Sequence, residues 1–275
     1  MTVDIRDVRF DYPSGTRALD GITLRINDGE RVAFIGQNGS GKTTLVKHFN
    51  GLLRPTSGTV MIDGLDIRRR RLSDLARSVG FAFQNPDDQI FRASVAAEVA
   101  FGPQNLGLRG HELEAAVAGA LDALGLAKVR DAHPYTLNYA MRKLVSIAGV
   151  VAMRTPILVL DEPTTGQDQT GVRRIEHLLD AASLRQTTVV VVTHDMAFVA
   201  RNFARVVVMS EGKVRADGPP GDIFWRTEVL AAAGLEPPTV AALSQTLGGE
   251  RFWTIDDAER VLRERWSLPG TDTPA

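Results

Sequence analysis

The stretch GQNGSGKTT, Gly36 to Thr44, restricts the fold of this chain more than any other part of its sequence. It fits the pattern G-x-x-x-x-G-K-[S/T] and lies between RVAFIG, which has the pattern of a strand, and SGKTTLVKHFNGLL, which has the pattern of a helix. A glycine-rich turn in this position closes backbone N–H groups around a phosphate at the helix N-terminus. A chance glycine-rich turn would not need both flanks, so we expect an α/β chain that binds a nucleotide.

The residues of this loop have distinct expected roles. Lys42 is expected to reach the β- and γ-phosphates, and the Thr43 hydroxyl is expected to bind Mg²⁺. The other candidates for contacts with ATP in the same stretch are Gly36, Asn38, Gly39, Ser40, Gly41 and Thr44.

Two acids end the apolar run PILVLDEP. A buried strand of this kind would place Asp161 and Glu162 at the carboxyl edge of the sheet, beside the phosphate loop. We expect Asp161 to hold magnesium and Glu162 to polarise the attacking water as a general base. An acid that caps a helix before Pro163 would explain one carboxylate but not both. VVTHD places His194 at the end of the next strand. A lone histidine is usually structural, but at this strand end we expect His194 to reach the γ-phosphate.

Strand and helix patterns alternate along the rest of the chain. Period-two runs near the N-terminus, and GTVMIDGLDI with a turn at Asp63-Gly64, predict antiparallel strands. Residues from about 90 to 150 are rich in Ala and Leu with helical spacing. PILVLDEP and TTVVVVTHD are apolar throughout, as in strands buried on both faces of a parallel sheet. We therefore predict an α/β P-loop NTPase: a RecA-like parallel sheet core with an antiparallel β-subdomain and an inserted helical subdomain.

The predicted division has three parts. The nucleotide-binding core with its β-subdomain comprises 1–89 and 151–228, the helical subdomain 90–150, and a C-terminal helical tail 229–275. In the tail, Thr254 is expected to cap a helix whose apolar face carries Ala258, Val261, Leu262 and Trp266. That face would pack on its own domain or help to hold two subunits together. We expect residues 267–275, SLPGTDTPA, to lack fixed structure.

Composition excludes several classes of function. The chain has no cysteine, which excludes disulfides and thiolate sites, and its net charge of −1 argues against a broad nucleic-acid surface. No apolar run is long enough to span a bilayer, and the first 15 residues lack a signal-peptide core. We expect a cytosolic protein that serves a membrane, if at all, through a partner.

The motifs GQNGSGKTT, FQNP, ILVLDEP, TTGQD and VTHD, in this order, resemble those of the ATP-binding cassette ATPases over about residues 1–225. The resemblance implies ATP and Mg²⁺ as cofactors. It implies that Gln84 contacts Mg²⁺ and the attacking water and links the site to a membrane partner, and that Asp168 lies in a loop at a dimer interface. It also implies that Tyr12 stacks on adenine, for which a flat ring is suited, although an ordinary strand-end tyrosine is the alternative.

One motif departs from the family. The residues after Leu137 normally read Ser-Gly-Gly-Gln and grip the γ-phosphate of ATP bound to the other subunit. Here the four interface positions hold Asn138, Tyr139, Ala140 and Met141, and Leu144 stands where arginine is usual. Tyr139 puts a ring where a phosphate must approach the backbone closely. We expect the site completed by this segment to be catalytically poor, which favours a heterodimer over a homodimer.

FQNPDDQIF, VAAEVAFGPQNLGL and GLEPPTVAALSQTLG look like the ATPases of energy-coupling factor transporters, which import vitamins and transition-metal ions. This resemblance implies an assembly of two ATPases, a transmembrane coupling subunit and a substrate-binding membrane subunit, with this chain peripheral on the cytoplasmic face of the membrane. Three alternatives stay open. A small-molecule kinase leaves the paired acids unexplained, a soluble cassette protein of DNA repair or translation would carry a second cassette or DNA-binding elements, and a regulatory ATP-binding subunit makes Glu162 superfluous.

Overall fold

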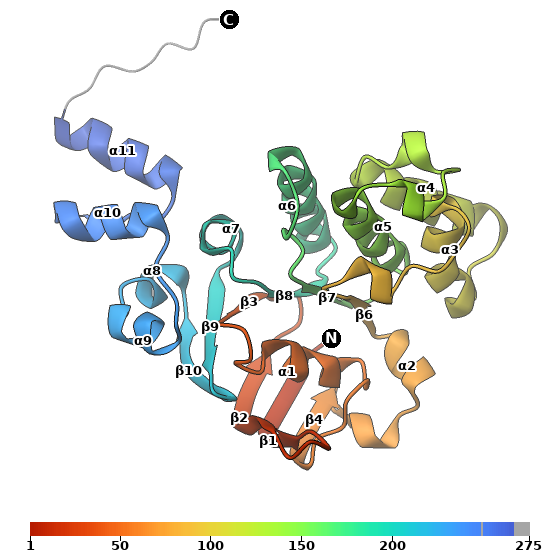
Figure 1. Ribbon diagram of the computed structural model, residues 1–275, viewed down its shortest axis with the longest axis horizontal. Coiled ribbons are helices and arrows are strands. Elements are labelled where there is room, and N and C mark those ends of the chain that lie inside the picture. The colour runs from red at the N-terminus through yellow and green to blue at the C-terminus, as the bar shows by residue number, and fades with distance from the viewer. Residues whose placement is uncertain (249, 267–275) are drawn as a thin grey trace, which may run out of the picture.

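The computed structural model describes residues 1–248 and 250–266 of the chain, which form two sheets with helices around them (Figure 1). The strands are β1 (Val3–Asp11), β2 (Arg17–Ile26), β3 (Arg31–Ile35), β4 (Ser57–Ile62), β5 (Leu65–Asp66), β6 (Val79–Ala82), β7 (Ile157–Asp161), β8 (Thr188–Val192), β9 (Arg205–Ser210) and β10 (Lys213–Gly218). One sheet has the order β10-β9-β3-β8-β7-β6 and is parallel except for β10. The other has the order β2-β1-β4-β5 and is antiparallel. The predicted fold class is confirmed, including the turn at Asp63-Gly64 between β4 and β5.

Helices occupy the connections between the strands. The α-helices are α1 (Lys42–Phe49), α2 (Leu72–Ala76), α3 (Val95–Leu106), α4 (Gly110–Ala123), α5 (Tyr139–Ala152), α6 (Gln169–Leu184), α7 (Met196–Asn202), α8 (Pro220–Ile223), α9 (Thr227–Ala232), α10 (Thr239–Leu247) and α11 (Ile255–Trp266). Short 3₁₀ turns are η1 (Ile67–Arg69), η2 (Pro86–Asp88), η3 (Ala127–Val129) and η4 (Pro134–Thr136). Figure 1 shows α3, α4 and α5 at one end of the molecule and α8 to α11 at the other.

The parallel sheet is covered on both faces, which explains its continuous apolar strands. Alternate residues of β7 point to opposite sides. Leu158 and Leu160 belong to one apolar cluster, shared with α3 to α6, whereas Ile157 and Val159 belong to a second, shared with α1 and the antiparallel sheet. All four side chains are 5% exposed or less. Both faces of each strand therefore need apolar residues, as the sequence pattern indicated.

The C-terminal segment contacts the phosphate loop directly. The backbone N–H of Gln37 donates to the carbonyl of Ala233, just after α9, at 3.3 Å, and the Ser210 hydroxyl donates to the carbonyl of Ala232 at 3.3 Å. The predicted boundary between residues 228 and 229 falls within α9. The segment that follows the last strand is thus tied to the loop that is expected to hold phosphate.

The last two described helices pack on each other. Thr254 caps α11 as predicted, because its hydroxyl accepts from the backbone N–H of Asp257 at 3.1 Å. Ala258 and Val261 are buried with Phe252, and partly buried residues of α10 and α11 surround them: Val240, Leu247 and Leu262. The predicted apolar stripe therefore packs, at least in part, within its own chain. The side chain of Trp266 and the prediction for residues 267–275 lie outside the described residues.

In the part of the chain that the structure describes, no helix is both long and apolar enough to cross a bilayer.

Candidate active site

The phosphate loop runs from the end of β3 to the first turn of α1, as predicted. Two glycines are required by the backbone. Gly41 has φ +99°, and a Cβ there would lie 2.5 Å from the carbonyl oxygen of Ala18; a Cβ on Gly36 would lie 2.2 Å from the carbonyl oxygen of Met209. Any side chain at either position would collide with backbone, so the loop can hold this shape only with glycine.

Lys42 is buried beneath the loop. Its ammonium donates to the carbonyls of Gly36 and Gln37 at 2.7 and 2.9 Å, and to the Ser40 hydroxyl at 3.2 Å. Burial lowers the pKa of Lys42, and the carboxylates at the end of β7 oppose that shift. All three ammonium donors are used within the loop, so Lys42 must exchange some of these bonds to contact a phosphate.

Thr43 and Asp161 come together although they are far apart in the sequence. The Thr43 hydroxyl donates to Asp161 Oδ1 at 3.2 Å. Asp161 is 1% exposed, and burial raises the pKa of its carboxyl while the bond from Thr43 opposes the shift. The end of β7 thus reaches the first turn of α1, the arrangement that the two motifs predicted.

Glu162 and His194 form a second pair. His194 Nδ1 lies 3.0 Å from Glu162 Oε1 and 2.9 Å from Oε2, and the Thr193 hydroxyl donates to Oε2 at 3.3 Å. The Glu162 side chain is 7% exposed, whereas that of His194 is 66% exposed. Glu162 has φ +49°, a conformation that costs a non-glycine residue about 1 kcal/mol or more, and its N–H is fixed to the carbonyl of Val192 at 2.8 Å. The fold therefore holds one carboxylate in a strained, defined position next to an imidazole that is open to solvent.

Lys143 is the site residue that the sequence reasoning missed. It is fully buried, and its ammonium donates to the carbonyls of Phe83, Gln84 and Asp161 at 2.8, 2.7 and 2.8 Å. Burial lowers the pKa of Lys143 to about 8. One cation thus joins α5 to the ends of β6 and β7. The sequence did offer one signal for this role, a lysine within the apolar part of an amphipathic helix. A lysine at such a position is buried only when its ammonium is paired, so it predicts a buried partner.

Gln84 follows β6 and is exposed. Its carbonyl accepts from Lys143, and no hydrogen bond of its side chain is found among the described residues. The loop after it is fixed by Gln89, whose side chain accepts from the N–H of Phe83 at 3.1 Å and donates to the carbonyl of Ser146 at 2.9 Å. Lys143 therefore places the backbone of Gln84 beside the end of β7 and leaves its side chain free to bind.

Residues 138–141 form the N-terminus of α5. Asn138 caps the helix, with its side-chain oxygen accepting from the N–H of Met141 at 2.9 Å. Tyr139 is 37% exposed, Ala140 follows it, and Leu144 is buried in the large apolar cluster shared with α3 to α6. The helix is thus well capped and packed, and residues 138–141 at its start include neither serine nor glycine.

The loop that contains Asp168 lies against this segment. Asp168 caps α6 by accepting from the N–H of Gly171 at 2.7 Å, and Gln167 donates to the carbonyl of Ala140 at 3.0 Å. A Cβ on Gly166 would lie 2.9 Å from the ring of Tyr139. The two segments predicted to face a second subunit are therefore neighbours.

Tyr12 lies at the start of the β1–β2 turn. Its hydroxyl is 3.0 Å from the Thr44 hydroxyl, and its ring meets the ring of Phe10 edge-on at 4.9 Å. The structure thus ties Tyr12 to the helix that begins at the phosphate loop, which is compatible with the predicted role beside adenine.

The arrangement supports hydrolysis of a bound nucleoside triphosphate. The loop and the N-terminus of α1 offer backbone N–H groups to phosphates, and Lys42 supplies positive charge. Glu162 can take a proton from an attacking water, and His194 can exchange that proton with solvent because it contacts both Glu162 oxygens.

Magnesium fits the oxygen ligands that converge here. Among the residues that the structure describes, no group of three or more His, Cys, Asp or Glu side chains could hold a metal alone. Thr43 and Asp161 would instead supply a hydroxyl and a carboxylate, with Gln84 near them, and phosphate oxygens would complete the shell. A bound Mg²⁺ would neutralise charge on the phosphates.

Comparison with known families decides the class of the chain. The profile of the family described as "ABC transporter" matches residues 19–165. The chain belongs to this family. It is an ABC ATPase, an ATP-binding and ATP-hydrolysing subunit of the transporter type.

Curated relatives and solved structures agree with this assignment. The energy-coupling factor transporter ATP-binding protein EcfA of Methanocaldococcus jannaschii is 42% identical over 247 residues, which cover 89% of this chain and 88% of that protein. EcfA of Methanothermobacter thermautotrophicus is also 42% identical, with 89% and 79% covered. The structure of cbiO1 from Clostridium perfringens, part of the ABC transporter complex cbiONQ, matches with a TM-score of 0.74 and 37% identity, covering 88% of this chain and 98% of that one. The dimeric structure of an ATP-binding cassette in a post-hydrolysis state, bound to ADP and Pi, matches with a TM-score of 0.74 and 28% identity. The match covers 79% of this chain and 98% of that one.

Proposed function

We propose that this ABC ATPase powers an importer of the energy-coupling factor type from the cytoplasmic face of the membrane, and that it works in an asymmetric dimer with a different ATPase subunit. The observation that carries the proposal is a contrast within the chain. The Thr43–Asp161 and Glu162–His194 pairs are complete, whereas the first turn of α5 carries Asn138 and Tyr139 in place of serine and glycine. One nucleotide site would therefore be built well by this chain and the other poorly.

The asymmetry follows from the chemistry of the α5 N-terminus. The side-chain oxygen of Asn138 is already used in capping the helix, so only its amide N–H groups remain for a phosphate. The ring of Tyr139 occupies space that a glycine would leave open, beside Gly166. Since a hydrogen bond to a charged group contributes about 1.5–3 kcal/mol, loss of these donors would slow hydrolysis at the site that this helix completes.

The proposed importer class rests on the printed names of the relatives and on one exposed patch near Gln84. Phe91 is 59% exposed and meets Phe101 edge-on at 4.8 Å, and the Arg92 guanidinium lies 5.1 and 4.6 Å from these two ring centres. Glu98 accepts from the N–H groups of Phe91 and Arg92 at 2.9 and 2.7 Å. An aromatic patch of this kind, fixed on the loop that follows Gln84, suits the docking of a transmembrane coupling subunit.

The remaining roles belong to the same proposal. Residues 90–150 would act as the helical subdomain that meets the second ATPase through positions 138–141, with Asp168 in the facing loop. Tyr12 would stack on adenine, and Thr43, Asp161 and Gln84 would bind Mg²⁺. The assembly would include a substrate-binding membrane subunit and no nucleic acid.

The test is ATPase turnover of defined assemblies in mild detergent. The chain alone should hydrolyse ATP slowly, and the chain with its membrane subunit and a second ATPase that has an intact Leu-Ser-Gly-Gly-Gln segment should be faster by about tenfold or more, because each added charged contact can contribute that much. Rapid turnover by the purified homodimer would reject the asymmetric arrangement.

The altered α5 N-terminus also favours a second candidate, a regulatory subunit that binds ATP and hydrolyses little. In that case the mixed assembly would keep its turnover when Glu162 of this chain is replaced, since only the partner's catalytic residues would act.

A further inference from the structure

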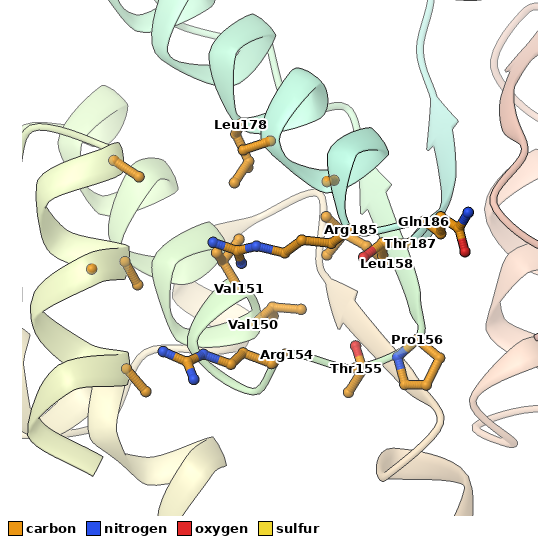
Figure 2. A pocket seen from close by; sticks show the side chains of 16 residues that line it. Val150, Val151, Arg154, Thr155, Pro156, Leu158, Leu178, Arg185, Gln186 and Thr187 are labelled. Atoms are coloured by element: carbon orange, nitrogen blue, oxygen red, sulfur yellow. The ribbon is translucent and has the colours of Figure 1, made fainter. Parts of the chain in front are cut away.

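A cavity of about 650 Å³ opens at the edge of the parallel sheet opposite the nucleotide site, where β7 and β8 begin (Figure 2). Residues of α4, α5 and α6 line it together with the two segments that lead into these strands. β7 starts at this edge and ends at Asp161, so the cavity and the magnesium ligand lie at opposite ends of one buried strand. The site is therefore separate from the one that binds ATP.

The walls of the cavity are made of small apolar groups. They include Ala116, Gly119, Ala120 and Ala123 of α4, Val150 of α5 and Ala182 of α6. A Cβ on Gly119 would meet no atom within 4 Å, so the space beside α4 is open. The volume lies within the range of about 300–1,000 Å³ that is usual for small-molecule sites.

The charged groups at this cavity have one sign. Arg154 and Arg185 line it, and none of its described lining residues is Asp or Glu. Figure 2 shows both guanidiniums extending in the same direction across the cavity. In the described part of the chain neither guanidinium has a hydrogen-bond or ion-pair partner, unlike Arg31 and Arg205, which hold Asp180 and Asp217.

Both arginines follow helix ends, where a cation can simply stabilise the end of the helix. The last carbonyls of a helix attract cations. A side chain that served this purpose would fold back onto those carbonyls, and neither guanidinium donates to one. Arg154 also has φ +53° at the position after α5 where glycine is usual, a conformation that costs about 1 kcal/mol or more. Both arginines are exposed, so solvent reaches their guanidiniums, and the helix-end explanation leaves the strained backbone of Arg154 unexplained.

Of the uncharged polar side chains at the cavity, Thr155 is used by the fold, whereas Gln186 and Thr187 also line the cavity. The Thr155 hydroxyl accepts from the N–H of Gly80 at 3.0 Å and donates to the carbonyl of Ile157 at 2.9 Å. The two guanidiniums are the charged groups at this cavity, and their forked donors match a carboxylate or phosphate.

We propose that this cavity binds an amphipathic organic anion, with its carboxylate or phosphate head on Arg154 and Arg185 and its apolar body among the small residues of α4 and the ends of α5 and α6. Such a ligand would contact both α4 and α5, which lie between β6 and β7 in the sequence, and α6, which follows β7. It would therefore connect the inserted helices to the core. The proposal does not depend on the importer assignment, because binding is measured on the purified chain without nucleotide.

The test is calorimetric titration of the full chain with decanoate and with decyl phosphate below their micelle concentrations, which distinguishes the two head groups. At least one should bind at a single saturable site and raise the melting temperature. Decanol and decyltrimethylammonium, which have the same body without an anionic head, should bind at least tenfold more weakly. Comparable binding of all four compounds, or of none, would overturn the proposal.

Variants locate the binding. Arg154→Gln and Arg185→Gln should each weaken it about tenfold, the effect of one charged contact, whereas Arg69→Gln removes an exposed arginine elsewhere and should leave it unchanged. Gly119→Leu should fill the open space and abolish binding while the chain stays folded, since no neighbour lies within 4 Å of the added Cβ. Binding that survives Gly119→Leu, or that ignores both arginines, would show that the anion does not enter this cavity.

Discussion

The phosphate loop with its facing carboxylates and the N-terminus of α5 differ in what they keep. In the first region, the side chains that we expect to face the phosphates are fixed by specific contacts, which involve Lys42, Thr43 and Glu162. In the second, Lys143 joins three carbonyls and Leu144 packs in the core, while residues 138–141 at the start of the helix include neither serine nor glycine. The packing role of a helix can thus be separated from its ligand-binding role, so a well-packed helix does not by itself imply a complete ligand site.

The largest expected effect comes from removing the carboxylate of Glu162, which faces the phosphate loop. Glu162→Gln in the mixed assembly should lower the turnover of the nucleotide bound by this chain by about 10²–10⁴-fold, because general-base catalysis contributes about that much. ATP affinity should change little, since the amide keeps the shape of the side chain. Single-turnover hydrolysis and equilibrium binding of ATP measure the two quantities. Unchanged total turnover would mean that this chain is regulatory.

Lys143→Met measures how much the inward contacts of α5 contribute to stability. It leaves three carbonyls without their donor, so the free energy of unfolding should fall by about 3 kcal/mol. Lys128→Met, at an exposed lysine, is the matched control and should change stability by less than about 0.5 kcal/mol. Urea unfolding measures both; equal stability of the two variants would mean that Lys143 does not hold the strands.

Restoring the outward residues should repair the weaker region. The combined change Asn138→Ser, Tyr139→Gly, Ala140→Gly and Met141→Gln should raise homodimer turnover by about tenfold, the effect of one regained charged contact. Tyr139→Phe keeps the bulk of the ring and should give no gain. If the restored variant is no faster, the altered segment does not limit hydrolysis.

The smallest effect concerns α1, on the intact side. His48 is fully buried, its Nδ1 lies 2.7 Å from the carbonyl of Thr44, and its Nε2 has no partner. Burial lowers the pKa of His48, so between the folded value and the ordinary one near 6.5 the unfolded chain binds more protons. Stability should therefore fall as pH drops below about 6.5, by at most about 1.4 kcal/mol per pH unit.

Thermal or urea unfolding between pH 7 and pH 5 tests this dependence. His48→Leu should flatten it, whereas His177→Leu, at an exposed histidine, should not. An identical slope in the His48 variant would assign the pH dependence to other groups.

Sequence reasoning predicted the parts of this molecule that depend on local patterns. The phosphate loop has a fixed spacing, and the buried strands have continuous apolar runs, so Thr43 and Asp161 could be expected at one edge of a sheet. Lys143 could not, because its role depends on carbonyls from β6 and β7 that the topology brings to it. The contact between Gln167 and the carbonyl of Ala140 is likewise set by the packing of two loops, which no local pattern encodes.

The hydrogen bond from Gln37 to the carbonyl of Ala233 bears on how fragments of this protein should be designed. A shortened version that stops after β10 would retain every motif of the cassette. It would, however, lack the Ala233 carbonyl that accepts a hydrogen bond from the phosphate loop. Cutting beyond residue 235 would spare that support, so the smallest dependable expression unit is longer than the motifs alone suggest.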